Sequence, residues 1–176
     1  RSTIKTNYNV KEKLITFESS SSRLRNTIID YGGQLSINPF NLDLHINLGS
    51  YKISQLFSLN PIFIEFVKSK LLFNDKLSVN LSINANTNKR DEIFDDAKIN
   101  FKIINGAINF DKTTFVNNDI GQLELSNSNL FFENNGLILN TDILITIKDT
   151  NRLFSVLNTK KKSRKDIKKI FINLDY

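Results

Sequence analysis

Hydrophobic and polar residues alternate with a period of two along much of this chain, which is the pattern of half-buried β-strands. Five runs show it clearly, at residues 4–10, 40–48, 77–84, 97–103 and 143–147. Because successive side chains of a strand point to opposite faces, each run has one apolar face and one polar face. A sheet with one covered face and one wet face favours antiparallel pairing.

Clusters of Gly and Asn lie between several of these runs and predict tight turns, because both residues reach the positive φ that hairpins need. The four clusters are Tyr31-Gly32-Gly33, Asn105-Gly106, Asn117-Asn118-Asp119 and Asn134-Asn135-Gly136. Short turns between successive strands predict a meander.

Two stretches depart from the alternation and predict short helices. Residues 51–72 and 150–169 carry hydrophobic residues three or four positions apart, as on one face of a helix. Each stretch follows a strongly alternating run, which indicates two repeat-like units at about residues 1–74 and 75–176. The first residue is Arg1 rather than Met, so we expect residues 1–176 to form a single segment of a larger β-rich protein.

The predicted strands need something to cover their apolar face, since a soluble protein does not leave a large apolar face in water. Short helical segments are too few to cover a wide sheet. The sequence therefore predicts a mainly β fold, a long curved antiparallel sheet that forms a taco-like groove or gutter with two short helical insertions. A β-sandwich, in which a second sheet covers the first, is the alternative.

An apolar gutter would bind acyl chains, because each methylene removed from water contributes about 0.8 kcal/mol. We expect phospholipid acyl chains to lie against the apolar side of the strands. The predicted lining residues are Leu42, Leu44, Ile46, Leu77, Val79, Leu81, Ile83, Ile99, Phe101, Ile103, Leu123, Leu125, Ile143, Ile145 and Ile147.

The net charge of +6 is concentrated in one segment near the end of the sequence. The candidate basic surface there consists of Lys160, Lys161, Lys162, Arg164 and Lys165. This segment could contact phosphates of nucleic acid or lipid, but a solvated helix face is the favoured interpretation. Nucleic-acid binding is disfavoured, because aromatic side chains do not interleave with these lysines.

Little in the sequence points to catalysis or metal binding. The one histidine, His45, falls on the polar side of an alternating run, and the chain has no cysteine. Acidic pairs at residues 91–92 and 95–96 stand beside basic residues, which favours a solvated loop over a calcium or magnesium site. We therefore expect no catalytic residues, no metal site, no cofactor and no enzymatic activity.

Three segments in the second half of the chain resemble strands of the bacterial AsmA-like family. That family carries an nGxIxf strand, a dxGxlxl strand and an ngLxLxgdlxl strand in this order. The matching segments are Asn105-Gly106-Ala107-Ile108-Asn109-Phe110, Gly121-Gln122-Leu123-Glu124-Leu125 and Leu137-Ile138-Leu139-Asn140-Thr141-Asp142. Residues 147–176 are also similar, so the resemblance to the C-terminal region of AsmA-, YhdP- and TamB-type proteins covers about residues 75–176.

The resemblance implies a periplasmic β-groove protein of Gram-negative bacteria, anchored in the inner membrane through a segment outside this sequence. The implied function is phospholipid transport between the inner and outer membranes, or outer-membrane maintenance. It carries no catalytic motif onto this chain. A structural or adhesive β protein of the cell surface is the alternative, since its regular strands and polar faces would give a similar pattern.

Overall fold

The computed structural model describes residues 2–24, 27–87 and 93–176, with the backbone alone for residues 57–63. Its β-strands are β1 (Asn7–Lys11), β2 (Leu14–Leu24), β3 (Thr27–Ile37), β4 (Phe40–Gly49), β5 (Ser78–Asn86), β6 (Asp96–Ile104), β7 (Ala107–Asn109), β8 (Thr114–Asn117), β9 (Gly121–Glu133), β10 (Gly136–Ile147) and β11 (Lys169–Asp175). Its helices are α1 (Asn60–Lys68) and α2 (Thr150–Val156), with short 3-10 helices η1 (Ile53–Leu59), η2 (Leu71–Phe73) and η3 (Lys161–Ser163).

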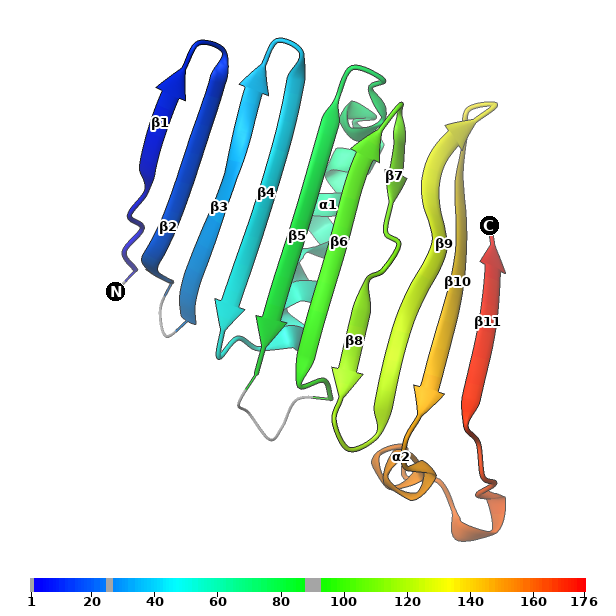
Figure 1. Cartoon of the computed structure of the whole chain (residues 1–176). Helices are drawn as coiled ribbons and strands as arrows, with labels where there is room; N and C mark the ends of the chain where they lie inside the picture. The colour runs from blue at the N-terminus through cyan, green and yellow to red at the C-terminus, as the bar shows by residue number, and fades with distance from the viewer. Residues whose placement is uncertain (1, 25–26, 88–92) are drawn as a thin grey trace.

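The described strands all belong to one sheet, in which β1 and β11 are the outer strands. Strands β7 and β8 lie end to end between β6 and β9 and together fill one position of the sheet. Figure 1 shows these strands side by side in a single layer. The prediction of a mainly β fold with a long sheet and two helical insertions is confirmed, and the described strands do not form the second layer of a sandwich.

The pairing departs from a pure antiparallel meander at one position. Strands β4 and β5 are parallel, whereas the other strand pairs are antiparallel. Parallel neighbours need a crossover, and η1, α1 and η2 supply it between these two strands. The antiparallel prediction is therefore wrong for this pair, because the helical insertion carries the chain back across the sheet before it resumes the same direction.

Three of the four predicted turns are confirmed. Residues 105–106 join β6 to β7, residues 118–120 join β8 to β9, and residues 134–135 join β9 to β10. Asn134 and Asn135 both have positive φ, at 49° and 64°, as a two-residue hairpin turn requires.

The predicted turn at Tyr31-Gly32-Gly33 is wrong, because these residues lie in the middle of β3. The glycines serve close packing of β3 against β4 instead. A Cβ on Gly33 would stand 2.0 Å from the backbone oxygen of Asp43, and one on Gly32 would stand 3.0 Å from the ring of His45. Glycine inside a strand marks such close approaches as readily as it marks turns.

The second predicted helical stretch is shorter than expected. Helix α2 ends at Val156, η3 covers three residues, and β11 begins at Lys169. The basic run therefore does not form the expected solvated helix face. Closely spaced like charges destabilise a helix, and the run offers few hydrophobic residues to hold one on the sheet.

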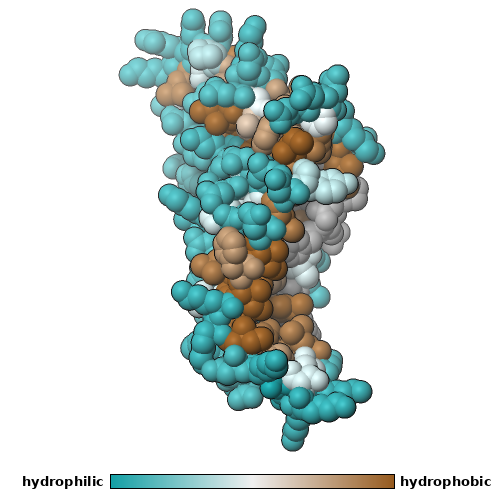
Figure 2. All heavy atoms as spheres, turned by 90° about the vertical axis from the view of Figure 1, so that its right-hand side faces the viewer, coloured by the Kyte–Doolittle hydropathy of each residue, from teal (hydrophilic) through white to brown (hydrophobic). Residues whose placement is uncertain are grey.

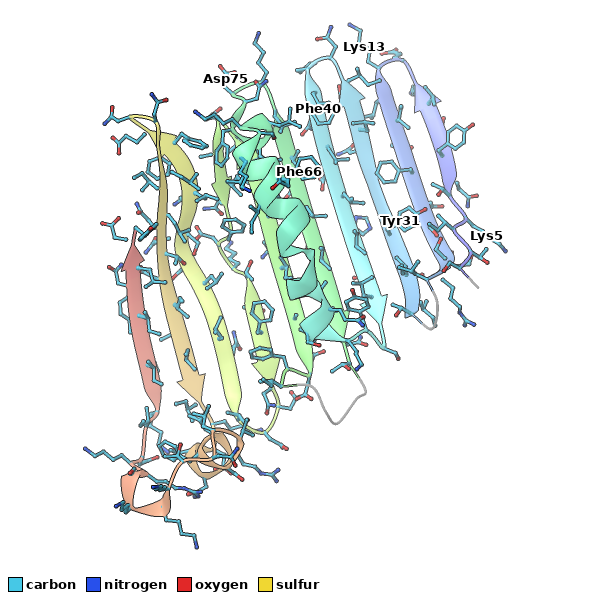
Figure 3. All side chains as sticks on the ribbon, turned by 180° about the vertical axis from the view of Figure 1, so that it is seen from behind. Lys5, Lys13, Tyr31, Phe40, Phe66 and Asp75 are labelled. Carbon is cyan, nitrogen blue, oxygen red and sulfur yellow. The ribbon has the colours of Figure 1, made fainter. Side chains whose placement is uncertain are left out.

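The core lies where the crossover packs on the sheet. One buried cluster joins Ile53 of η1 to Ala85, Ala97 and Phe115, and a second joins Ile103, Ile108 and Leu130. Side chains from α1 and η2, including Val67 and Phe73, pack on the second cluster. The crossover thus covers the middle of the sheet and leaves its two sides outside this cover, as Figure 3 shows from the helix side.

Candidate apolar lipid surface

One face of the sheet carries rows of apolar side chains that cross it from edge to edge. The longest row follows the strand register through Val10, Ile15, Leu35, Leu42, Val79, Ile103, Ile108, Leu130 and Leu139. Neighbouring strands lie about 4.8 Å apart, so this row spans about 40 Å. The alternation seen in the sequence is thus brought into register across separate strands.

The predicted lining residues fall on this same face. The register pairs Leu44 with Leu81 and Ile46 with Ile83 across β4 and β5, and it pairs Leu125 with Ile143 across β9 and β10. The remaining predicted residues continue these rows or pack against the core clusters of this face: Leu42, Leu77, Val79, Ile99, Phe101, Ile103, Leu123, Ile145 and Ile147.

The crossover changes what part of this face is open. Ile103 is 1% exposed and Ile147 is 4% exposed, so these two predicted lining residues are buried and do not line an open surface. Leu77, Val79 and Phe101 are half-buried and pack on the same cluster as Val67 and η2. Ile103 is buried because side chains of α1 and η2 pack on its cluster, as expected when a parallel β-α-β connection lays its helix over the sheet. Ile147 belongs to neither core cluster and lies at the end of β10, three residues before α2 begins.

Exposure of the apolar face increases toward β1. Tyr8 is 74% exposed and Val10 is 58% exposed, whereas the centre of the same row is buried. We call the apolar residues of β1, β2 and β3 the N-terminal flank; they are Tyr8, Val10, Ile15, Phe17, Tyr31 and Leu35. Tyr31 points to the same side of the sheet as α1 in Figure 3, which places the N-terminal flank beside the crossover.

The same apolar face is also exposed at the other edge of the sheet, along β10 and β11. We call the apolar residues of its last strands the C-terminal flank; they are Ile143, Ile145, Ile170, Ile172 and Leu174. Leu139 packs on the second core cluster and is not part of this flank. Ile172 and Leu174 on the outer strand are 38% and 43% exposed. Figure 2 shows hydrophobic atoms gathered in a band between hydrophilic margins on the side that carries β11.

The total surface area measures how much of the molecule is left uncovered. A compact monomer of 20.2 kDa exposes about 8,800 Å² by the usual scaling of surface with mass, whereas this chain exposes 12293 Å². Among the described residues, nine hydrophobic side chains are buried and twenty large hydrophobic side chains are exposed. Some of the exposed side chains lie on the apolar face, among them Tyr8, Val10, Ile172 and Leu174, so folding of this chain alone leaves part of that face open to further contacts.

Polar side chains interrupt the apolar face in two places, and hydrogen bonds satisfy them there. Ser128 and Thr141 are buried and hydrogen-bond to each other with 2.5 Å between their hydroxyl oxygens. Ser19 and Ser22 form a similar pair at 2.7 Å. Since neutral paired hydroxyls cost little to bury, these positions break the apolar rows without adding charge.

The opposite face of the sheet is polar and carries cross-strand amide contacts. Asn84 donates to Asn47 at 2.9 Å, and Asp142 accepts from Asn173 and from Asn127, each at 2.7 Å. These two hydrogen bonds hold the pKa of Asp142 below its usual value of 3.8, and the bond from Asn173 has the larger effect. Asn47, Asn84, Asn127 and Asn173 thus contribute their amides to hydrogen bonds on this wet face.

The histidine and acidic residues considered for catalysis or metal binding do not form a cluster among the described residues. His45 is exposed on the polar face, opposite Gly32 on one neighbouring strand and Ser82 on the other. Within the described residues, no group of three or more His, Cys, Asp or Glu side chains could hold a metal ion. The acidic pair at residues 91–92 lies outside the described residues.

The basic residues lie at one end of the sheet, apart from the apolar rows. Lys160, Lys161, Lys162 and Lys165 are exposed, and Arg164 donates from Nε to the backbone oxygen of Thr159 at 3.0 Å. They follow α2, which Figure 1 places beyond the ends of β9 and β10.

Two flank groups escaped prediction from the sequence. The residues of β1 to β3 and of β11 were expected to form strands in part, but they were not expected among the lining residues. Ile15 and Phe17 carry the relevant signal, although Leu14 beside them blurs the alternation. Only the strand register shows that these residues continue the rows of β4 and β10.

No helix among the described residues is both long enough and apolar enough to cross a membrane. Comparisons with protein-family models, with curated proteins and with solved structures found no match to this chain.

Proposed function

We propose that this chain is a segment of a β-groove protein that carries phospholipid between the inner and outer membranes or maintains the outer membrane. The observation that supports the proposal is the apolar face of the sheet, whose N-terminal and C-terminal flanks lie outside the cover of the crossover. In this proposal the acyl chains of phospholipids occupy the flanks, and the polar face stays in water. The proposed location is the periplasm, with an inner-membrane anchor outside this sequence.

The energetics favour a ligand made of hydrocarbon. Each methylene removed from water contributes about 0.8 kcal/mol, so ten methylenes on a flank contribute about 8 kcal/mol before the cost of ordering the chain. The flanks offer such a ligand apolar side chains and few polar groups, since Ser128 and Thr141 already satisfy each other. A polar or charged substrate would gain little there.

The proposal predicts that purified protein carries phospholipid and takes up a fluorescent lipid. Native mass spectrometry and solvent extraction measure the first, and titration with a fluorescent phospholipid measures the second. A sharper test compares two faces of one strand. Ile172→Asn changes the C-terminal flank, whereas Phe171→Asn changes the opposite face of β11 at a side chain that is 64% exposed.

We expect Ile172→Asn to weaken lipid binding about tenfold, because an exposed Ile that loses acyl contact forfeits about half of the 1.5–3 kcal/mol of full burial. Phe171→Asn should leave lipid binding unchanged. Equal effects of the two substitutions, or protein that is lipid-free and takes up no lipid, would contradict the proposal.

A structural or adhesive role at a cell surface is the second candidate. The observation that favours it is the pair of outer strands, β1 and β11, because strand edges with unpaired backbone groups bind further strands. Analytical ultracentrifugation separates the two functions. Concentration-dependent assembly of lipid-free protein supports the structural role, and a lipid-loaded monomer supports the groove.

A further inference from the structure

The C-terminal end of the sheet combines positive charge with exposed apolar side chains. Residues 150–169 include eight Lys or Arg residues and one acidic residue, whereas the whole chain has a net charge of +6. The remainder of the chain therefore has a net charge of −1, and the positive charge belongs to this end alone. We call Lys160, Lys161, Lys162 and Lys165 the lysine cluster.

The second feature of this end is an exposed apolar pair. Val156 is the last residue of α2 and Leu157 follows it as the C-cap, and they are 53% and 62% exposed. Their neighbour Phe154 is buried and packs α2 on the rest of the protein, whereas Val156 and Leu157 point into solvent. Two residues separate Leu157 from Lys160, so the Cα atoms of these two residues lie within about 11 Å of each other, where the lysine cluster begins.

Hydrogen bonds and an ion pair hold this end in place. Asp149 accepts from the backbone nitrogens of Asn151 and Arg152 at 2.9 and 3.1 Å, and Arg152 pairs with Asp119 at 3.1 Å. Asp166 accepts from Thr150 at 2.9 Å and pairs with Lys168 at 3.2 Å. Asp119, Asp149 and Asp166 thus have partners other than the lysine cluster.

The lysine cluster takes part in none of these contacts, and its four side chains are exposed. Its four ammonium groups form no ion pair within the part of the chain that the structure describes. Their charge is therefore available to a partner with negative charge.

We propose that this end of the sheet docks on the surface of an anionic lipid bilayer. Val156 and Leu157 insert between the headgroups, and the lysine cluster contacts the lipid phosphates. Peripheral membrane segments combine these two features, because apolar insertion and attraction to anionic lipid add to each other. A nucleic acid would use the charge but would leave the apolar pair in water.

The place of this docking site in the fold supports the assignment. Figure 1 shows α2 and the following loop beyond the ends of β9 and β10, so the C-terminal flank runs toward the proposed bilayer. A bilayer at this end would lie across the ends of β9 and β10 rather than along the outer strand β11. The inference goes beyond the proposed groove, since docking requires no lipid to occupy the flanks.

The test measures co-sedimentation of the protein with vesicles of phosphatidylcholine alone and of phosphatidylcholine mixed with phosphatidylglycerol. We expect binding to the mixed vesicles only. Replacing the four residues of the lysine cluster by Gln should lower that binding by at least about a hundredfold. Val156→Ser with Leu157→Ser should lower it about tenfold while the charge stays constant.

A matched control removes the same charge from exposed positions elsewhere. It changes these four residues to Gln: Lys11, Lys13, Lys98 and Lys102. We expect this control to change vesicle binding by less than about threefold, because charges more than a Debye length from the bilayer are screened.

Three results would overturn the docking proposal. They are equal binding to neutral vesicles, an equal loss in the control variant, and binding to duplex DNA without binding to anionic vesicles. Uptake of a fluorescent lipid by the lysine-cluster variant reports separately on the groove, so failure of docking and failure of the groove are distinguishable.

Discussion

The packing of the helical crossover on the sheet predicts a large effect for Ile53→Ala. Ile53 is 0% exposed and contacts a cluster that includes Ala85, Ala97 and Phe115. The substitution removes three carbons, which contribute about 2.4 kcal/mol at 0.8 kcal/mol each. The cavity left between small alanines adds about 1 kcal/mol, so we expect the free energy of unfolding to fall by about 3–4 kcal/mol.

Urea titration followed by far-UV circular dichroism measures this change as a shift in the unfolding midpoint. Leu71→Ala is the matched control, because Leu71 lies in the same crossover but is 57% exposed. We expect it to change the free energy of unfolding by less than about 0.5 kcal/mol. Similar effects of the two substitutions would refute the conclusion that η1 anchors the crossover on the sheet.

Two further predictions concern the close approach of strands and the polar face. Gly33→Ala should lower the free energy of unfolding by about 3 kcal/mol in a thermal melt, because its Cβ would meet the Asp43 oxygen at 2.0 Å. Gly49→Ala is the control and should leave the free energy of unfolding unchanged, because its nearest contact is at 3.9 Å. Asn173→Ala should raise the pKa of Asp142 toward 3.8 in a carboxyl NMR titration. Since the folded state lowers this pKa, the stability it contributes is present above 3.8 and is lost as the pH falls through the folded value. An unchanged pKa would show that the Asn173 contact is absent in solution.

For the predicted lining residues, the sequence identified the face of the sheet but not whether that face is covered. Alternation identified Leu42, Leu44 and Ile46 as one side of a strand, and the register confirms that they share a face with their neighbours on β5. The same pattern could not show that Ile103 is buried, because alternation records which side a residue faces and not what covers that side.

The glycines of β3 mark a second limit. Gly32 and Gly33 have the composition of a turn, and local rules assign them one. Their actual role depends on Asp43 and His45 of the next strand, which approach too closely for larger side chains. Contacts between strands are invisible to rules that consider neighbouring positions only.

The sequence by itself determined that this chain forms strands with one apolar and one polar face, because a period of two is a local property of the backbone. It also determined where three of the hairpins turn, at residues 105–106, 118–120 and 134–135, since positive φ favours Asn and Gly. Only the tertiary structure decided the parallel pairing of β4 and β5, the cover over the middle of the sheet and the two open flanks. These features depend on the path of residues 50–77 across the sheet, which is set by long-range packing of Ile53 and Val67 rather than by local propensity.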